Sequence, residues 1–207
     1  MSGPHRSRRS DYAEATRQAI VDAARLLFAR KGYFLTTVED IAKEARVAPT
    51  TVYAVSGGKQ GLMRTLVDTW SQAPVVAESM GELDSFTDPD ALLRQTAVVV
   101  RSMRESFGDI MRMVLTTAPH NEDVSEGLAI GTERYRGALD AVAAHLHQIG
   151  GTHPDLTVQQ AADIMWFYFG YSGYFTLLDD NGWSYDEAER WLVRQATAAL
   201  RSGPHPA

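Results

Sequence analysis

The stretch FARKGYFLTTVEDIAKEARVAPTTVY, residues 28–53, decides the fold class of the chain. It begins near the end of a helix predicted over residues 11–31, in which apolar side chains recur every three or four positions. Gly32 follows where a left-handed helix cap is expected. Thr36 and Glu39 then have the capping-box spacing that begins a second, short helix.

A third helix is predicted over residues 50–55, after a break at residues 46–48. Pro49 favours the first position of a helix, because its missing N–H group needs no partner there. Gly57 and Gly58 are expected to end this helix. Two short helices separated by a turn of three or four residues indicate a helix-turn-helix unit.

The rest of the chain also has the helical period, and it has no period-2 run long enough for a sheet. Further helices are predicted over residues 59–73, 89–106, 109–117, 123–148, 158–178 and 185–201. Residues 75–90 are expected to form a linker or a fraying helix end, and Gly108 is expected to break a helix. Capping-box spacings begin the last two helices, at Thr157 and Ser184. The predicted fold class is all-α, with about nine helices.

The length of 207 residues favours a small module joined to a larger one. We predict a three-helix head over residues 1–57 and a larger C-terminal helical domain over residues 58–207, connected by the helix at 59–73. The chain has no cysteine, which excludes disulfides and thiolate metal sites and fits a reducing cytoplasm. It has no secretory signal and no apolar segment long enough to cross a bilayer, so no membrane partner is expected.

The net charge of −6 averages two unlike parts of the chain. Residues 1–64 hold 11 lysines and arginines against 6 acidic residues, whereas residues 65–207 hold the remaining 9 against 20. A basic head on an acidic body is typical of a protein that binds a polyanion with its head, although a basic segment can also serve solubility alone.

Three motifs in the head resemble the TetR family of dimeric transcriptional repressors. They are FARKGYFLTTVEDIA at residues 28–42, ARVAPTTVY at residues 45–53, and Lys59 two residues before Gly61. Residues 161–166 and 181–192 look like the last two helices of an actinobacterial subset of that family. The resemblance implies a C-terminal domain for ligand binding and dimerisation.

An α-helix fits the major groove of B-DNA, where its first residues reach the edges of the bases. Pro49, Thr50 and Thr51 are small enough for a close approach, and the threonines offer hydroxyl and methyl groups to bases. The resemblance implies that Tyr53 and Lys59 contact phosphates. Tyr53 as a core residue, and Lys59 as an ordinary solvated lysine, are the alternatives.

Three further places in the head concern phosphate contacts or differ from the family's usual residues. Thr36 or Thr37 is expected to hold a further phosphate, and Thr36 is also expected to cap the second helix. Arg46 occupies a turn position that usually holds glycine; a positive φ there costs about 1 kcal/mol, unless the turn is built differently, and the side chain is expected to contact a phosphate. Ala48 replaces the usual serine cap, at a cost of roughly 1 kcal/mol.

The helix predicted over residues 158–178 has apolar or aromatic residues on every side, so it is expected to be buried both by its own subunit and by a second copy. The resemblance implies that the last two helices form a four-helix bundle with their symmetry mates. The residues expected in this dimer interface are Tyr168, Tyr171, Phe175, Trp191, Leu192, Gln195 and Ala199.

A small-molecule effector is expected because of the family resemblance. The residues expected to line its cavity are methionines and aromatics that adapt to apolar guests, namely Met103, Phe107, Met111, Tyr135, Trp166, Phe167 and Tyr174. For each of them an ordinary core position is the alternative. Any of Arg101, Arg104, Arg112 and Arg134 that points inward would indicate an anionic guest.

Enzyme and metal chemistry is not expected, and no cofactor is predicted. Ser56 and Lys59 have the spacing of a serine–lysine nucleophile, but the accompanying motifs are missing. His145 and His147 are two apart, so they lie on different faces of a helix and do not share a metal readily. The predicted function is a cytoplasmic, homodimeric DNA-binding repressor that an apolar or aromatic ligand releases from a pseudo-palindromic operator. An activator, or a dimeric scaffold without ligand response, is the alternative.

Overall fold

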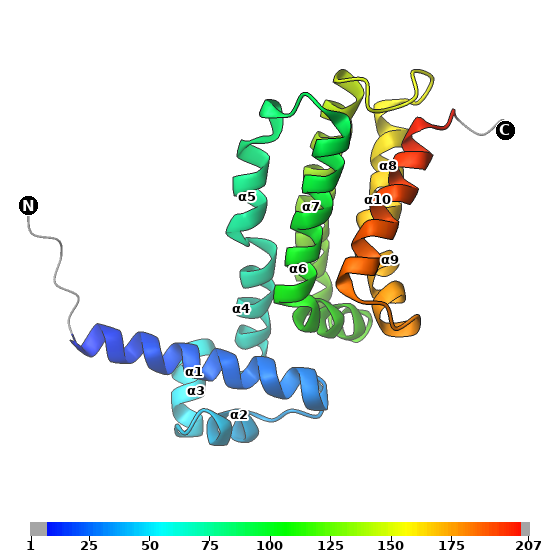
Figure 1. The fold of residues 1–207 in the computed structure, drawn as a ribbon. Coiled ribbons are helices and arrows are strands. Elements are labelled where there is room, and N and C mark those ends of the chain that lie inside the picture. The colour runs from blue at the N-terminus through cyan, green and yellow to red at the C-terminus, as the bar shows by residue number, and fades with distance from the viewer. Residues whose placement is uncertain (1–7, 204–207) are drawn as a thin grey trace, which may run out of the picture. The chain divides into compact units, whose positions relative to one another are not determined.

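The computed structural model describes residues 8–203, which form helices, turns and loops with no strand (Figure 1). The predicted all-α fold class is therefore confirmed. The chain divides into two compact units, residues 8–71 with 107–131 and residues 72–106 with 132–203. Two long helices, α6 (Pro89–Thr117) and α7 (Glu122–Gln148), contribute to both units. The functional division after residue 57 stays a prediction.

The first unit contains the predicted helix-turn-helix. Besides the end of α6, the short turn η2 (Ala118–His120) and the start of α7, its helices are α1 (Arg8–Lys31), α2 (Val38–Glu44), α3 (Pro49–Ser56) and α4 (Lys59–Ser71). Both α2 and α3 pack against α1. The centre of this packing consists of side chains that are at most 1% exposed, among them Ile20, Phe28, Ile41, Val52, Leu62 and Leu66.

The start of α2 differs from the prediction by one residue. The helix is capped by Thr37, whose hydroxyl accepts from the N–H of Asp40 at 3.1 Å, while the Asp40 carboxylate accepts from the N–H of Thr37 at 3.3 Å. The predicted cap with Thr36 and Glu39 is wrong because Thr36 is buried. Its hydroxyl donates to the Gly32 carbonyl at 2.8 Å and so helps to close the end of α1.

An ion pair joins α1 to α6 within the first unit. Arg25 donates to both carboxylate oxygens of Asp109, with nitrogen–oxygen distances of 2.6 and 2.7 Å. Burial alone would raise the pKa of Asp109, but the hydrogen bonds and charge of Arg25, together with backbone hydrogen bonds at Ile110 and Asp109, hold the pKa below its ordinary value of 3.8. The charged form of Asp109 is therefore the one that this unit stabilises.

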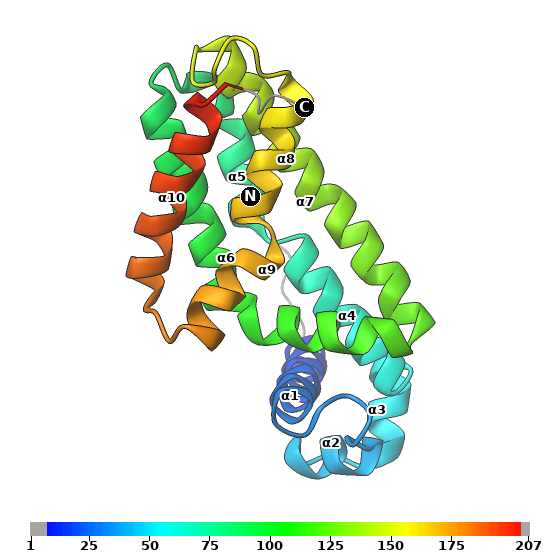
Figure 2. The same cartoon turned by 90° about the vertical axis from the view of Figure 1, so that its right-hand side faces the viewer.

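The second unit is a helical bundle. Besides its parts of α6 and α7 and the turn η1 (Leu83–Ser85), it contains α5 (Pro74–Gly81), α8 (Val158–Phe169), α9 (Tyr171–Phe175), the π-helical turn η3 (Thr176–Asp180) and α10 (Tyr185–Arg201). Helices α8 and α10 pack against each other, as Figure 2 shows. The predicted capping boxes at Thr157 and Ser184 are confirmed.

Three predicted boundaries after α4 are wrong. Gly108 does not break a helix, because it is buried inside a continuous α6, where packing outweighs the roughly 1 kcal/mol helix penalty of glycine. Residues 74–81 form a separate helix, α5, with Pro74 at its first turn, where a linker or a fraying helix end was predicted. The helix predicted over 158–178 is interrupted at Gly170, whose ψ of −174° is extended.

Gly170 is required at this interruption for a steric reason. A Cβ atom there would collide with the carbonyl oxygen of Trp166 and lie 3.3 Å from its ring. The chain therefore leaves α8 at a residue that has no side chain and starts α9 immediately afterwards. None of the helices formed by residues 8–203 has the length and apolar character needed to span a membrane.

Candidate nucleic-acid interface and effector unit

The first turn of α3 presents the small residues that were predicted to read bases. Pro49 stands at the start of the helix, and Pro49 and Thr50 are exposed while Thr51 is partly exposed. Val52, on the opposite face, is fully buried and holds α3 against the rest of the head. Ala48 caps the helix with no side-chain hydrogen bond, as expected for alanine.

Arg46 adopts the left-handed conformation of the turn between α2 and α3. Its φ is +58°, and it is the one non-glycine residue between 8 and 203 with a positive φ. The turn thus keeps the geometry that glycine adopts easily, at a steric cost of about 1 to 2 kcal/mol for arginine. Arg46 is exposed and stands three residues before the start of α3. It therefore adds a positive charge to the surface of the helix-turn-helix.

Tyr53 is a surface residue, so the alternative of a core tyrosine is wrong. It is 56% exposed, and its ring lies over the backbone of Gly58. A Cβ at Gly58 would come within 2.9 Å of the Tyr53 ring, and the φ of Gly58 is +86°. Glycine at this position therefore allows the tyrosine to lie against the start of α4 with its phenol at the surface.

Lys59 has a structural role that the sequence did not reveal. Its ammonium donates to the carbonyls of Tyr33 at 2.9 Å and Thr36 at 3.1 Å, and it lies 4.4 Å from the centre of the Tyr33 ring. Burial lowers the pKa of Lys59. The ammonium joins the start of α4 to the loop between α1 and α2, and one of its three N–H groups is left over from these two bonds.

Most of the predicted phosphate-contacting residues, though not Arg46, come together around one surface hollow of about 390 Å³. Thr37, Tyr53 and Lys59 all line it. Thr36 also borders the hollow, but its hydroxyl donates to carbonyls inside the head, so it is not a surface contact. A hydroxyl, a phenol and an ammonium around one hollow are groups that suit a phosphate.

The residues predicted to line an effector cavity do not form one group. Phe107 and Met111 belong to the first unit and the other five to the second. Phe167 is 73% exposed, so it faces solvent and its assignment to a cavity is wrong. Tyr135 and Trp166 do lie together in the second unit, with ring centres 5.6 Å apart, and both contact the ring of Tyr171.

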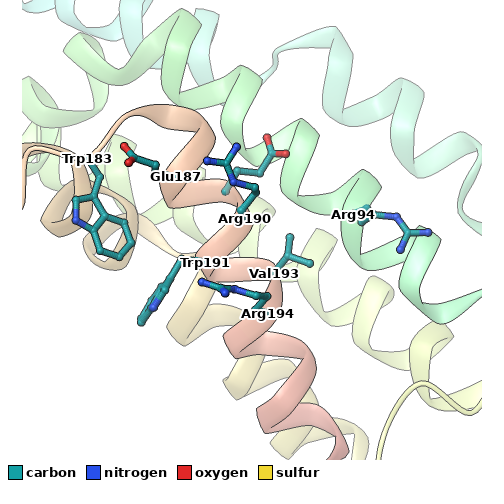
Figure 3. A pocket seen from close by; sticks show the side chains of 8 residues that line it. Arg94, Trp183, Glu187, Arg190, Trp191, Val193 and Arg194 are labelled. Atoms are coloured by element: carbon teal, nitrogen blue, oxygen red, sulfur yellow. The ribbon is translucent and has the colours of Figure 1, made fainter.

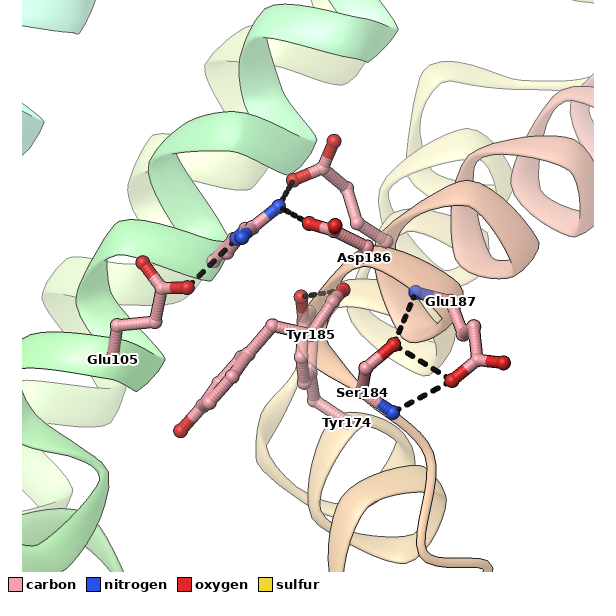
Figure 4. Close-up of polar contacts among 8 residues, drawn as sticks. Glu105, Tyr174, Ser184, Tyr185, Asp186 and Glu187 are labelled. Carbon is pink, nitrogen blue, oxygen red and sulfur yellow. Dashed lines mark hydrogen bonds and ion pairs between the residues drawn. The ribbon is translucent and has the colours of Figure 1, made fainter.

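Of the four arginines considered for an anionic guest, Arg104 is the one that points inward. It is 1% exposed, whereas Arg134 is exposed and Arg112 is partly exposed. Arg101 lies nearer the surface and pairs with Glu105, Asp186 and Glu189, a network that joins α6 to the start of α10 (Figure 4). Tyr174 also joins this region by donating to the carbonyl of Tyr185 at 3.3 Å.

The predicted dimer residues separate into two groups. Tyr171, Phe175 and Leu192 are at most 9% exposed within the single chain, so they belong to its own core and their assignment to an interface is corrected. The others remain partly exposed and lie on α8 and α10, namely Tyr168, Trp191, Gln195 and Ala199. These four define what we term the α8–α10 face.

An open groove of about 540 Å³ runs along α10 beside this face (Figure 3). The rings of Trp183 and Trp191 meet edge to face at 5.9 Å on one part of it, and Arg190 and Arg194 line it as well. Large aromatic rings flanked by arginines at a surface are typical of protein interfaces.

Comparisons with known proteins point to a regulator. The sequence model of the bacterial regulatory proteins of the tetR family matches residues 20–66. The uncharacterized HTH-type transcriptional regulator YvkB of Bacillus subtilis (strain 168) is 34% identical over 70 residues, which cover 33% of this chain and 37% of that protein. The probable HTH-type transcriptional regulator ArpR of Pseudomonas putida is 25% identical over 194 residues, 89% of this chain and 91% of that protein.

Solved structures share the fold at low sequence identity. The regulator FadR from Bacillus subtilis in complex with stearoyl-CoA has a TM-score of 0.69 at 16% identity, over 89% of this chain and 99% of that chain. A SmeT–triclosan complex has a TM-score of 0.67 at 17% identity, over 93% and 99%. The relatives are regulators and not enzymes, and the actinobacterial subset stays a prediction. The helix-turn-helix head thus matches the tetR family of bacterial regulatory proteins over residues 20–66, and nearly the whole chain is similar to a probable HTH-type transcriptional regulator.

Proposed function

We propose that the chain is a cytoplasmic, homodimeric repressor that binds a pseudo-palindromic operator in double-stranded DNA and releases it when an apolar or aromatic small molecule binds. The observation that carries the proposal is the exposed first turn of α3 beside the hollow lined by Thr37, Tyr53 and Lys59. One element supplies small side chains for base edges, and the other supplies donors for a phosphate.

The roles of the head residues are assigned from which of them are exposed. Thr50 and Thr51 stand at the end of α3 that is free to enter a groove, so they read bases. Tyr53 and Lys59 lie on either side of Gly58 and hold the phosphate backbone, which fixes the register of α3 but carries no sequence information. Arg46 adds a phosphate contact from the turn before α3.

Dimerisation supplies the second copy of α3 that a palindromic site requires. The α8–α10 face and the neighbouring groove leave Tyr168, Trp191 and Trp183 partly exposed, and the nearby Phe167 is largely exposed. A two-fold axis through this face buries these rings against their own copies. The two heads then meet half-sites about one helical turn of DNA, or slightly more, apart.

The effector acts through the second unit. The resemblance to SmeT, solved with triclosan, and to FadR, solved with stearoyl-CoA, supports a body that accepts apolar molecules. We expect the ligand to favour a conformation in which α4 moves, and Lys59 at the start of α4 carries the loop of Tyr33 and Thr36 with it. A coupling free energy of about 1 to 3 kcal/mol between ligand and operator is enough for switching.

Capture of genomic fragments by the purified full chain, followed by titration of a captured fragment and a random duplex at several salt concentrations, tests this proposal. The captured fragment should bind more tightly, and both affinities should fall steeply with salt, because phosphate contacts release counterions. Absence of binding to any duplex at low salt would refute a DNA-binding head. A promoter assay with and without the protein separates repression from activation.

A further inference from the structure

Arg104 is the one charged residue between residues 10 and 203 that is fully buried. It lies on α6 at the same helical face as Ala97, Val100 and Met111, which are all buried core residues. A guanidinium keeps its charge at any physiological pH, so this side chain brings a permanent cation into an apolar bundle. Burial of a cation is costly unless strong acceptors surround it.

The acceptors around Arg104 include neutral groups at the interruption between α8 and α9. A terminal nitrogen of Arg104 donates to the carbonyl of Gly170 at 3.0 Å, to that of Phe169 at 3.3 Å and to the phenol of Tyr135 at 3.3 Å. The chain leaves the helix at Gly170, so these carbonyls lie where the backbone turns away from α8. Arg104 therefore holds the interruption in place.

Aromatic rings form the walls around the same guanidinium. Its central carbon lies between 5.5 and 6.0 Å from four ring centres, those of Tyr135, Tyr171, Tyr174 and Phe175. We term these five residues the Arg104 cage. Burial raises the pKa of Tyr171 to about 12, so its phenol stays neutral at physiological pH. Tyr135 is partly exposed, whereas the other four residues of the cage are at most 9% exposed.

Nearby carboxylates are directed to a different arginine. Glu105, Asp186 and Glu189 pair with Arg101, three residues before Arg104 on α6 (Figure 4). Glu105 and Asp186 are exposed, so this ion network faces solvent. Arg101 thus pairs with carboxylates near the surface, whereas the contacts of Arg104 described above are with aromatic rings, a phenol and backbone carbonyls.

We propose that the Arg104 cage recognises the effector as an organic anion, a small molecule with a carboxylate and an apolar or aromatic body. The carboxylate pairs with Arg104 in place of the carbonyls of Phe169 and Gly170, since a charged, bidentate acceptor is stronger than a neutral carbonyl. The body packs among the rings of the cage. This inference rests on the proposed function for the existence of an effector and names its chemical class.

The same exchange of partners provides a route to a conformational change. When the ligand carboxylate pairs with Arg104, the carbonyls of Phe169 and Gly170 lose their hydrogen-bond donor. The junction of α8 and α9 then rearranges. The guanidinium belongs to α6, which continues without a break into the first unit. A ligand bound at the Arg104 cage therefore acts on a helix that also forms part of the unit that contains the head.

A library of matched pairs tests the proposal on the DNA-free full chain. Each pair is an aromatic or medium-chain carboxylic acid and its primary amide, and binding is measured by tryptophan fluorescence and by thermal shift. We expect some acids to bind at least about tenfold more tightly than their amides, the equivalent of a lost charge-assisted hydrogen bond. The acids should lose at least about tenfold affinity in Arg104→Gln and keep it in Arg134→Gln, an exposed control on α7.

Three results would overturn the proposal. The first is that no acid in the library binds. The second is that the acids that bind do so no more tightly than their amides. The third is that the affinity for the acids is unchanged in Arg104→Gln. The acid-to-amide ratio is measured in the wild-type chain, so the test stands even if Arg104→Gln fails to fold; Arg104→Lys, which keeps the charge, should retain part of the preference. Duplex binding is measured in parallel on the same preparation, so loss of the DNA-binding function and loss of the anion site are separate results.

Discussion

Replacement of Arg46 by glycine should stabilise the protein while it weakens DNA binding. Arg46 has a φ of +58°, and a non-glycine residue in this conformation costs about 1 to 2 kcal/mol. Glycine removes that cost but gives the unfolded chain about 0.4 to 1 kcal/mol of additional conformational freedom. The net gain is about 0.5 to 1 kcal/mol, which corresponds to an increase in Tm of roughly 2 °C for a chain of this size.

The effect on DNA has the opposite sign. A dimer without Arg46 loses two phosphate contacts, so the slope of log affinity against log salt should become shallower by about 2. Thermal unfolding at fixed protein concentration and fluorescence anisotropy with a captured duplex measure the two effects. Arg46→Ala is the matched control, because it removes the charge but keeps a side chain at positive φ; it should show the shallower slope without the stabilisation. An unchanged slope, or a lower Tm in Arg46→Gly, would refute the reasoning.

Four further substitutions test other contacts. Thr37→Ala removes the cap of α2 and should lower the stability by about 1 kcal/mol in thermal unfolding. Asp109→Asn should lower the Tm at neutral pH, and this difference should vanish as the pH falls below 3.8, because the lowered pKa of Asp109 means that its pairing with Arg25 stabilises the charged form. Gly170→Ala adds a Cβ against the preceding turn and should cost about 1 to 3 kcal/mol by denaturant unfolding. Trp191→Glu should shift the dimer to monomer in light scattering, with an unchanged helix content by circular dichroism; a dimer that persists contradicts the proposed interface.

Local signals predicted the elements that depend on nearby residues. Pro49 and Gly57 mark the two ends of α3, and the structure begins and ends the helix beside them. Where two neighbours carry the same signal, sequence alone does not choose between them. Thr36 and Thr37 are both good caps, and only the burial of Thr36 against the end of α1 assigns the cap to Thr37.

Tertiary packing decided the boundaries that were predicted wrongly. The helix penalty of Gly108 is about 1 kcal/mol, which the packing of a long buried helix exceeds. Gly170 has the same intrinsic preference, yet it does end a helix, because Arg104 binds the carbonyls that are released there. Two glycines with one propensity thus have opposite outcomes, and the difference lies in contacts between distant segments.

The candidate site shows the same limit. The exposed residues of α3 follow from their place in the motif, but the acceptors of Lys59 lie 26 and 23 residues earlier in the chain, so spacing does not reveal its role in tethering a loop. The burial of Arg104, in contrast, is indicated by its position in the sequence. Arg104 stands four residues after Val100 and seven after Ala97, on the apolar face of α6, and an arginine at that period indicates a buried cation.

The most direct test of the central claim is a hydroxyl-radical footprint of the full chain on a captured operator, read on both strands. Two copies of α3 held by one dimer predict two protected stretches related by two-fold symmetry, with centres about 10 to 10.5 base pairs apart or slightly more. Protection of one half-site alone by a stable complex, or uniform protection with no symmetric centre, would contradict the claim that a dimer places two heads in the grooves of one duplex.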